Sequence, residues 1–88
     1  MVFDMQNSGE AITLNAWQFP ASIRHQVIFD LLDALPVHHT LMLVNDHDPK
    51  HLFYQIDAEQ PGVFSRTSTK EDNALFYVPI TRLIGRIT

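Results

Sequence analysis

The chain has 88 residues, 45% of them hydrophobic and 18% charged, with a formal net charge of -4, which is typical of one globular domain rather than a disordered chain. The six basic residues are spread along an acidic chain, which argues against nucleic acid as a partner. The absence of cysteine excludes disulfides, thiolate nucleophiles and thiolate metal ligands.

The beginning of the chain predicts a lead-in followed by a strand. Residues 1–10 are polar and mixed, so we expect a poorly ordered lead-in, with a single domain over residues 11–88. Ile12, Leu14 and Ala16 then alternate with polar residues, which is the period of a half-buried strand.

The clearest helix comes next. Its apolar positions recur at helical spacing, and they are Val27, Ile28, Leu31, Leu32 and Leu35. Pro36 closes this helix, while its start is open between a cap at Ser22 and one at His25 with Gln26 in the first turn. The continuous apolar run 41–44 predicts a buried strand parallel to the first, completing a right-handed βαβ unit.

The second half of the chain predicts one more helix and a hairpin. Asp48 and Pro49 predict the start of a helix that ends near Ala58, with Asp48 as the cap. Two extended stretches follow, 63–69 and 74–83, joined by a polar turn over 70–73. Because Pro79 cannot donate to a ladder, the last strand is predicted to lie at an edge or to carry a bulge.

The predicted order is therefore βαβαββ. Two helices are too few to cover both faces of a four-stranded mixed sheet, so we place both on one face. The expected fold is a two-layer α/β sandwich with one open sheet face, which could pair with a second copy in a homodimer.

The topology predicts a polar rim at one sheet edge. The first helix starts where the first strand ends, and a parallel second strand ends at the same edge. Six polar or charged side chains should meet there, namely Arg24, His25, Asn45, Asp46, His47 and Asp48. This rim is the candidate ligand-binding site.

Four uses of the rim stay open. His25, His47 and Asp46 could hold zinc or iron, although their spacing matches no known metal signature. Two helix N-termini and Arg24 could hold a small anion, and an imidazole oriented by a carboxylate could perform acid–base chemistry. Alternatively, the polar groups of the rim only form hydrogen bonds within the protein, with Asp48 capping a helix and Asp46 pairing with Arg24.

Several motifs resemble a bacterial domain of unknown function, number 2249. They are Arg24-His25-x-x-Ile28-Phe29, Asp33-Ala34-Leu35-Pro36, Leu43-Val44-Asn45-Asp46-His47-Asp48-Pro49-x-x-Leu52-x-Tyr54-Gln55 and Ala58-Glu59-x-Pro61-Gly62-x-Phe64-Ser65. The resemblance covers residues 12–82 and implies a TusA-like fold and an association with hemerythrin-like domains, but no activity. The chain departs from the family at Gln26, where proline is usual, and at Arg66, where tryptophan is common.

The leading hypothesis is a small non-thiol accessory module that binds a metal ion or small ligand at the rim, and an enzyme stays open as a third possibility. The alternative is a protein-interaction or regulatory domain with a purely structural rim. A hemerythrin-like or other redox protein is the expected partner. With no spanning segment and no signal peptide at the N-terminus, we expect no membrane partner and a cytoplasmic location.

Overall fold

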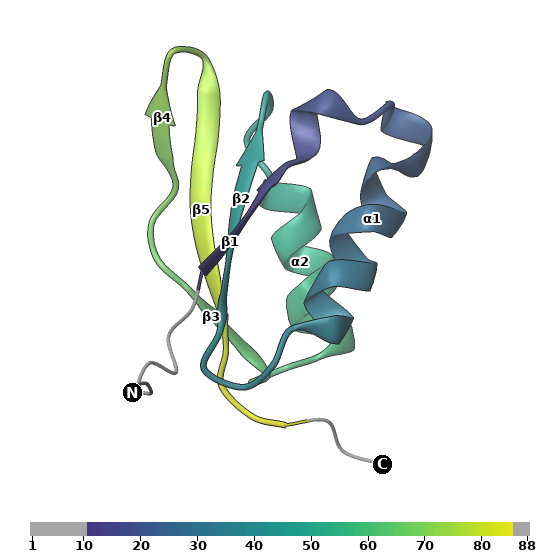
Figure 1. Cartoon of the computed structure of the whole chain (residues 1–88), viewed down its shortest axis with the longest axis vertical. Helices are drawn as coiled ribbons and strands as arrows, with labels where there is room; N and C mark the ends of the chain where they lie inside the picture. The colour runs from purple at the N-terminus through teal and green to yellow at the C-terminus, as the bar shows by residue number, and fades with distance from the viewer. Residues whose placement is uncertain (1–10, 86–88) are drawn as a thin grey trace, which may run out of the picture.

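The chain folds as a sheet with two helices, in a computed structural model that describes residues 11–85 (Figure 1). Its elements are, in order, β1 (Ala11–Asn15), the 3-10 segment η2 (Ala16–Gln18), α1 (Ala21–Ala34), β2 (Thr40–Asn45), α2 (Lys50–Glu59), β3 (Phe64–Arg66), β4 (Lys70–Asp72) and β5 (Leu75–Arg82). The predicted lead-in over residues 1–10 lies outside the described part. Neither described helix is long and apolar enough to cross a membrane.

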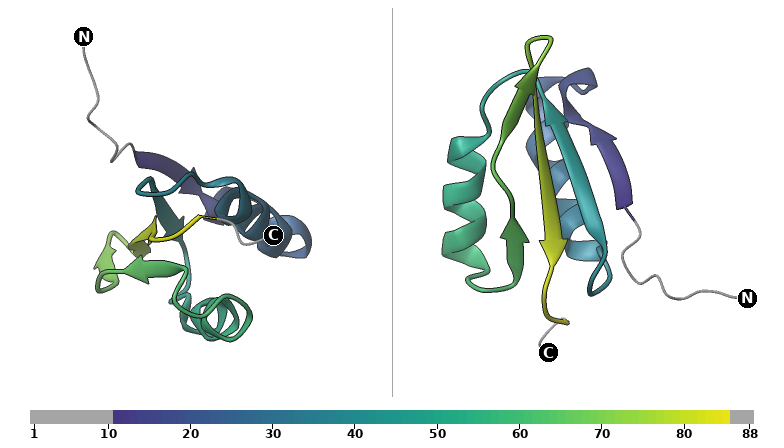
Figure 2. Two further views of the ribbon diagram at one scale, coloured as in Figure 1. Left: turned by 90° about the horizontal axis from the view of Figure 1, so that it is seen from below. Right: turned by 90° about the vertical axis from the view of Figure 1, so that its left-hand side faces the viewer.

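The sheet is mixed. β1 and β2 are parallel, with Thr13 opposite Met42, and the other pairings are antiparallel. The strand order is β1-β2-β5-β3, and β4 also pairs with β5. Both helices pack on the same face of this sheet (Figures 1 and 2), which confirms the predicted two-layer α/β class and the parallel βαβ unit.

The core lies between the sheet and the helices. Alternate residues of the two central strands point at the helices and are fully buried, namely Leu41, Leu43, Val78 and Ile80. They pack in one cluster with Ile28 and Leu32 of α1 and with Phe53 and Ile56 of α2. The apolar faces of the helices and of the strands therefore pack against each other. This packing also fixes where the polar ends of these elements lie.

Both helices start differently from the prediction. α1 begins at Ala21, and the Pro20 carbonyl accepts hydrogen bonds from the amides of Ile23 and Arg24 at 3.1 and 3.0 Å. The predicted caps at Ser22 and His25 were therefore wrong, because Pro20 holds the cap position and both residues lie inside the helix.

At the second helix, Pro49 occupies the cap position and makes no side-chain capping bond. Its carbonyl accepts from the Phe53 amide at 3.2 Å. The helix starts one residue later than expected, which leaves Asp48 outside the cap position. The predicted Asp48 cap was wrong, and Asp48 is exposed.

The hairpin differs from the prediction in its turn and strand count. Residues 70–72 form β4 instead of a turn, and the chain reverses at Asn73 and Ala74, whose φ angles are 54° and 64°. Two consecutive positive φ angles are typical of a two-residue hairpin turn. The predicted strand 63–69 is shortened to β3, and β4 comes from the residues predicted to form the turn, so the sheet has five strands rather than four.

Pro79 lies in a central strand rather than at an edge. β5 pairs with β2 on one side and with β3 and β4 on the other. The Pro79 carbonyl accepts a bond from Thr67, at 3.4 Å, in the gap between β3 and β4. In an extended strand a residue's nitrogen and carbonyl point to the same side, so the missing N–H faces this gap. The prediction of an edge strand was wrong because the partner strand is interrupted there.

Candidate functional site

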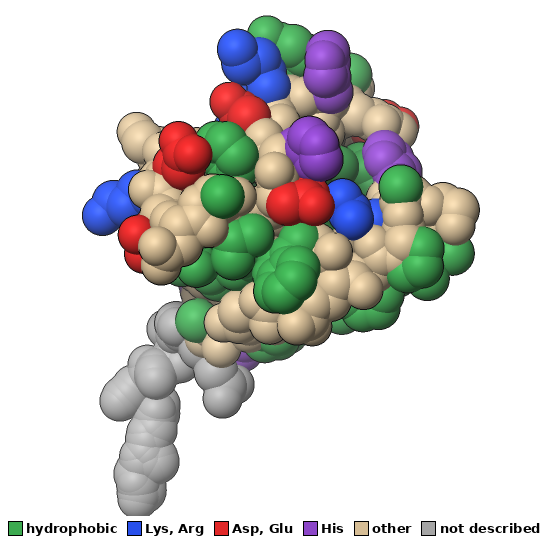
Figure 3. All heavy atoms as spheres, turned by 90° about the horizontal axis from the view of Figure 1, so that it is seen from above, with side chains coloured by type: hydrophobic (Ala, Val, Ile, Leu, Met, Phe, Trp, Pro, Cys, Tyr) green, Lys and Arg blue, Asp and Glu red, His purple; other side chains and the backbone are tan. Residues whose placement is uncertain are grey.

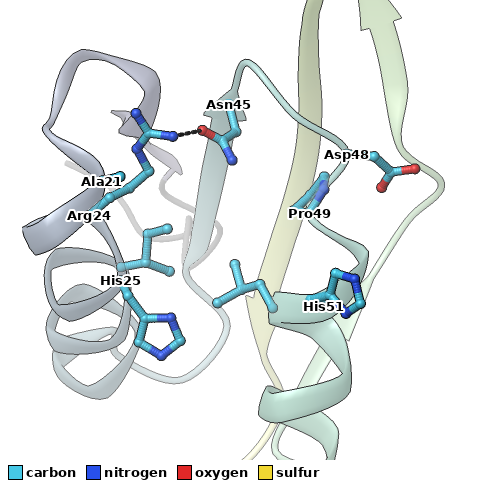
Figure 4. Close-up of a pocket in the computed structure, with 9 residues that line it drawn as sticks. Ala21, Arg24, His25, Asn45, Asp48, Pro49 and His51 are labelled. Carbon is cyan, nitrogen blue, oxygen red and sulfur yellow. Dashed lines mark hydrogen bonds between the residues drawn. The ribbon is translucent and has the colours of Figure 1, made fainter.

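The end of β2 and the start of α1 meet at one edge of the molecule. Because β1 and β2 run parallel, the chain after β1 and the chain after β2 emerge side by side. Arg24 of α1 donates from Nη1 to Asn45 Oδ1 at 3.3 Å (Figure 4). The same Nη1 donates to Asp46 Oδ1, also at 3.3 Å. These contacts bring together three of the six predicted rim residues.

Arg24 is a rim residue that also forms hydrogen bonds to the backbone before α1. Its Nε and Nη2 donate to the Phe19 carbonyl at 3.2 and 2.8 Å, and Nη2 also reaches the Trp17 carbonyl at 3.4 Å. Only 19% of its side chain is exposed. Most of its donors are thus already engaged with the η2 segment and the end of β2, leaving few for an incoming anion.

Asp46 and His47 form a hydrogen-bonded pair. The distance from His47 Nδ1 to Asp46 Oδ1 is 2.7 Å, and because an ionised carboxylate only accepts, Nδ1 carries the proton. This hydrogen bond is the main reason that the pKa of Asp46 lies below its ordinary value; desolvation opposes it, and the charges of His47 and Arg24 add to the lowering. The His47 side chain is 81% exposed, with Nε2 free of partners among the described residues.

A solvent-open pocket of about 210 Å³ lies next to this network, between α1 and α2. It is lined by Ala21, Arg24, His25, Ile28, Asn45, Asp48, Pro49, His51 and Leu52. Four of the six predicted rim residues thus line it, whereas Asp46 and His47 do not. Figure 4 shows its walls coming from α1 on one side and from α2 on the other.

The two histidines of the pocket come from different helices. His25 belongs to α1 and stacks on Phe29, with ring centroids 4.6 Å apart. His51, in the first turn of α2, makes an edge contact with Tyr54 at 6.2 Å. Sequence reasoning did not include His51 in the site. Its position, two residues after Pro49, was the available signal, because first-turn side chains lie near the sheet edge where a helix starts.

Asp48 is not tied into the network. Its carboxylate forms no hydrogen bond or ion pair with any other residue of 11–85. In Figure 4 it points away from the Arg24 side of the pocket. Together with His25 and His51, Asp48 is a polar group at the pocket that the rest of the described protein leaves unbonded.

The predicted metal ligands are not gathered into one set. Within residues 11–85 no group of three or more His, Asp or Glu side chains is arranged to hold a metal ion. His47 turns to Asp46, while His25 stacks on Phe29 and lines the pocket from which both of the others are absent. His25 therefore lies in a different part of the rim from His47 and Asp46.

The surface that carries the rim is chemically mixed. Seen from above, histidine side chains lie close to acidic and basic ones there, with apolar side chains around them (Figure 3). Asp46 offsets the charge of Arg24, because the two side chains form an ion pair at 3.3 Å. The arrangement suits hydrogen bonding to a ligand better than strong attraction of an ion.

Comparison with known proteins identifies a family but no activity. A family model described as an uncharacterized conserved protein, DUF2249, matches residues 13–82, which is most of the chain. No curated protein and no solved structure matches the chain. The family resemblance predicted from the motifs is confirmed, whereas the TusA-like fold and the hemerythrin association stay predictions.

Proposed function

This chain belongs to the DUF2249 family, whose description assigns no activity, and we propose that it is a small non-thiol accessory module that binds a small organic ligand in the pocket between α1 and α2. One observation supports the proposal: some polar side chains of the rim form hydrogen bonds within the protein, and others do not. Arg24, Asp46 and His47 bond to one another or to backbone carbonyls, whereas the side chains of His25, Asp48 and His51, all at the pocket, have no hydrogen-bond partner among residues 11–85.

The lining of the pocket indicates the kind of ligand. Ile28, Leu52 and Pro49 provide apolar surface, and the two imidazoles can each donate and accept a hydrogen bond. Asn45 uses its oxygen on Arg24, which leaves its amide nitrogen as a donor. A volume of about 210 Å³ holds only a small molecule. We therefore expect a ligand with an apolar body and one or two hydrogen-bonding groups.

The other uses of the rim have less support. A metal would need His25, His47 and Asp46 to converge, which they do not. An anion would meet an arginine whose donors are engaged and whose charge Asp46 offsets. The Asp46–His47 pair has the geometry of an oriented base, but it lies outside the pocket lining, so a ligand in the pocket is not presented to it.

The direct test is a ligand screen followed by NMR. We expect a small polar organic ligand to shift the amide signals of residues 24–28 and 45–52 and to leave β3 and β4 unchanged. Ala21→Leu places a larger side chain in the pocket wall and should abolish these shifts. Ala58→Leu, the same change at an exposed α2 position that does not line the pocket, is the matched control.

Two results of this screen would reject the proposal. One is equal binding by the Ala21→Leu and Ala58→Leu proteins, which would place the ligand elsewhere. The other is a set of shifts spread over the open sheet face, which would favour the alternative of a protein-interaction or regulatory domain. The expected partner, a hemerythrin-like or other redox protein, and the cytoplasmic location stay predictions from the family resemblance and the sequence.

A further inference from the structure

The two edges of the sheet are protected to different degrees. Among the strands that the structure describes, β1 pairs with β2 alone, and it is the outermost strand in the right-hand view of Figure 2. Its sequence, Ala-Ile-Thr-Leu-Asn, contains no charge, proline or glycine. An edge strand of this kind offers its unpaired backbone groups to another strand, because it carries none of the features that usually prevent such pairing.

The opposite edge carries these features. It is made of two short strands of three residues each, β3 and β4. Charged residues are present on both, namely Arg66, Lys70, Glu71 and Asp72. Short, interrupted and charged edges resist strand addition. The contrast between the two edges therefore favours β1 as the strand that pairs with another chain.

From this contrast we propose that two copies of the chain associate by pairing their β1 strands antiparallel into one continuous sheet. The pairing that suits the strand is centred on Thr13. It places Ala11 opposite the partner's Asn15, Ile12 opposite the partner's Leu14 and Thr13 opposite the partner's Thr13. All side chains then meet others from the same face of the sheet.

Ile12 is the residue that gains most from this register. It lies on the helix-covered face, since its partner in β2 is the buried Leu41, yet 45% of its surface is exposed. Leu14, on the same face, is buried. Pairing would set each Ile12 beside the partner's Leu14 and remove apolar surface from water.

Electrostatics and shape favour a second copy as the occupant. Each chain carries a formal net charge of -4, but the interface itself contains no charge, so no like charges meet across it. In the right-hand view of Figure 2, α1 lies behind the sheet beside β2 and does not extend beyond β1. The helices of two copies would therefore lie side by side over the shared sheet without blocking the edge.

The expected association is weak, because only five residues from each copy pair. Interfaces smaller than about 1,200 Å² are usually transient. Sedimentation equilibrium should show the 10.1 kDa monomer at low concentration and a rising share of dimer toward millimolar concentration. In the same range, concentration-dependent NMR shifts should be confined to β1 and its immediate neighbours.

Two matched variants test the location of the interface. Thr13→Lys would set two ammonium groups opposite each other and should keep the protein monomeric at every concentration. Ser65→Lys adds the same group to exposed β3 at the other edge and should leave the dimer intact. A wild type that stays at 10.1 kDa, or dimers that persist in Thr13→Lys, would overturn the proposal. If Thr13→Lys does not fold, the NMR shifts of the wild type on dilution still decide it, because shifts away from β1 would place the interface elsewhere.

Discussion

Arg24 and Asp46 are 22 positions apart in the chain, yet Nη1 of the arginine lies 3.3 Å from Oδ1 of the aspartate. The contact joins the first helix to the loop after the second strand. It forms because β1 and β2 are parallel neighbours, so the segments that follow them emerge at the same edge. The pocket lies directly beside this contact, and its shape therefore depends on Arg24.

Replacing Arg24 should destabilise the protein mainly through lost backbone contacts. Arg24→Met removes charge-assisted bonds to the Phe19 and Trp17 carbonyls; the first bond is partly buried and the second is exposed, so each contributes less than the roughly 3 kcal/mol that hydrogen bonds to charged groups can reach. Asp46→Asn removes only the negative charge of an exposed side chain and keeps Oδ1 as an acceptor, so it should lower the free energy of unfolding less. Urea denaturation of both variants measures the order, and a larger effect of Asp46→Asn would contradict this account.

The pH dependence of Asp46 follows from its lowered pKa. A carboxyl whose pKa is lower in the folded than in the unfolded state stabilises the protein at pH values above the unfolded-state pKa. This contribution is lost as the pH falls through the folded-state pKa. The difference in stability between wild type and Asp46→Asn should therefore shrink below the ordinary value of 3.8. Denaturation curves at a series of acidic pH values measure it, and a difference that grows toward acid pH would contradict the sign.

The cause of the lowered pKa can be tested separately. Because the hydrogen bond from His47 is the largest cause, His47→Ala should raise the pKa of Asp46 toward its ordinary value more than Arg24→Met does. Carboxyl NMR titration of the two variants provides the comparison. The opposite order would mean that the arginine charge, rather than the imidazole hydrogen bond, dominates.

Asp48 should be nearly neutral for stability. A true N-cap loses about 1 kcal/mol when it is replaced by alanine. Asp48 makes no capping bond, because Pro49 holds the cap position, so Asp48→Ala should fall well short of that loss. If thermal unfolding shows the full loss, the side chain caps α2 in solution. The same variant should weaken ligand binding in the pocket if its carboxylate takes part.

The hairpin turn offers a stabilising substitution. Ala74 has a φ of 64°, which is unfavourable for a residue with a Cβ and readily adopted by glycine. Ala74→Gly should raise the free energy of unfolding by about 0.5–1 kcal/mol, since the relief of strain exceeds the added chain entropy. Ala58→Gly in exposed α2 should lower it by a similar amount. Two losses of stability would show that Ala74 is not strained.

The elements whose residues carry strong local patterns were predictable. The alternation in β1, the helical spacing from Val27 to Leu35 and the apolar run of β2 indicated the βαβ unit, and from it the meeting of Arg24 with the segment after β2. Each of these patterns reports which face of an element is buried, and burial follows directly from the order of apolar and polar residues.

Other features depended on tertiary structure. The start of each helix was decided by the proline that holds its cap position, since several residues in a row can cap a helix equally well in isolation. The split between β3 and β4 depended on where β5 could accept partners around Pro79. His51 lines the pocket although it was not predicted to, because packing sets the direction of its side chain. His47 does not line it, because its ring bonds to Asp46 instead. Sequence order determined which segments meet at the rim, and three-dimensional packing decided which side chains face the pocket.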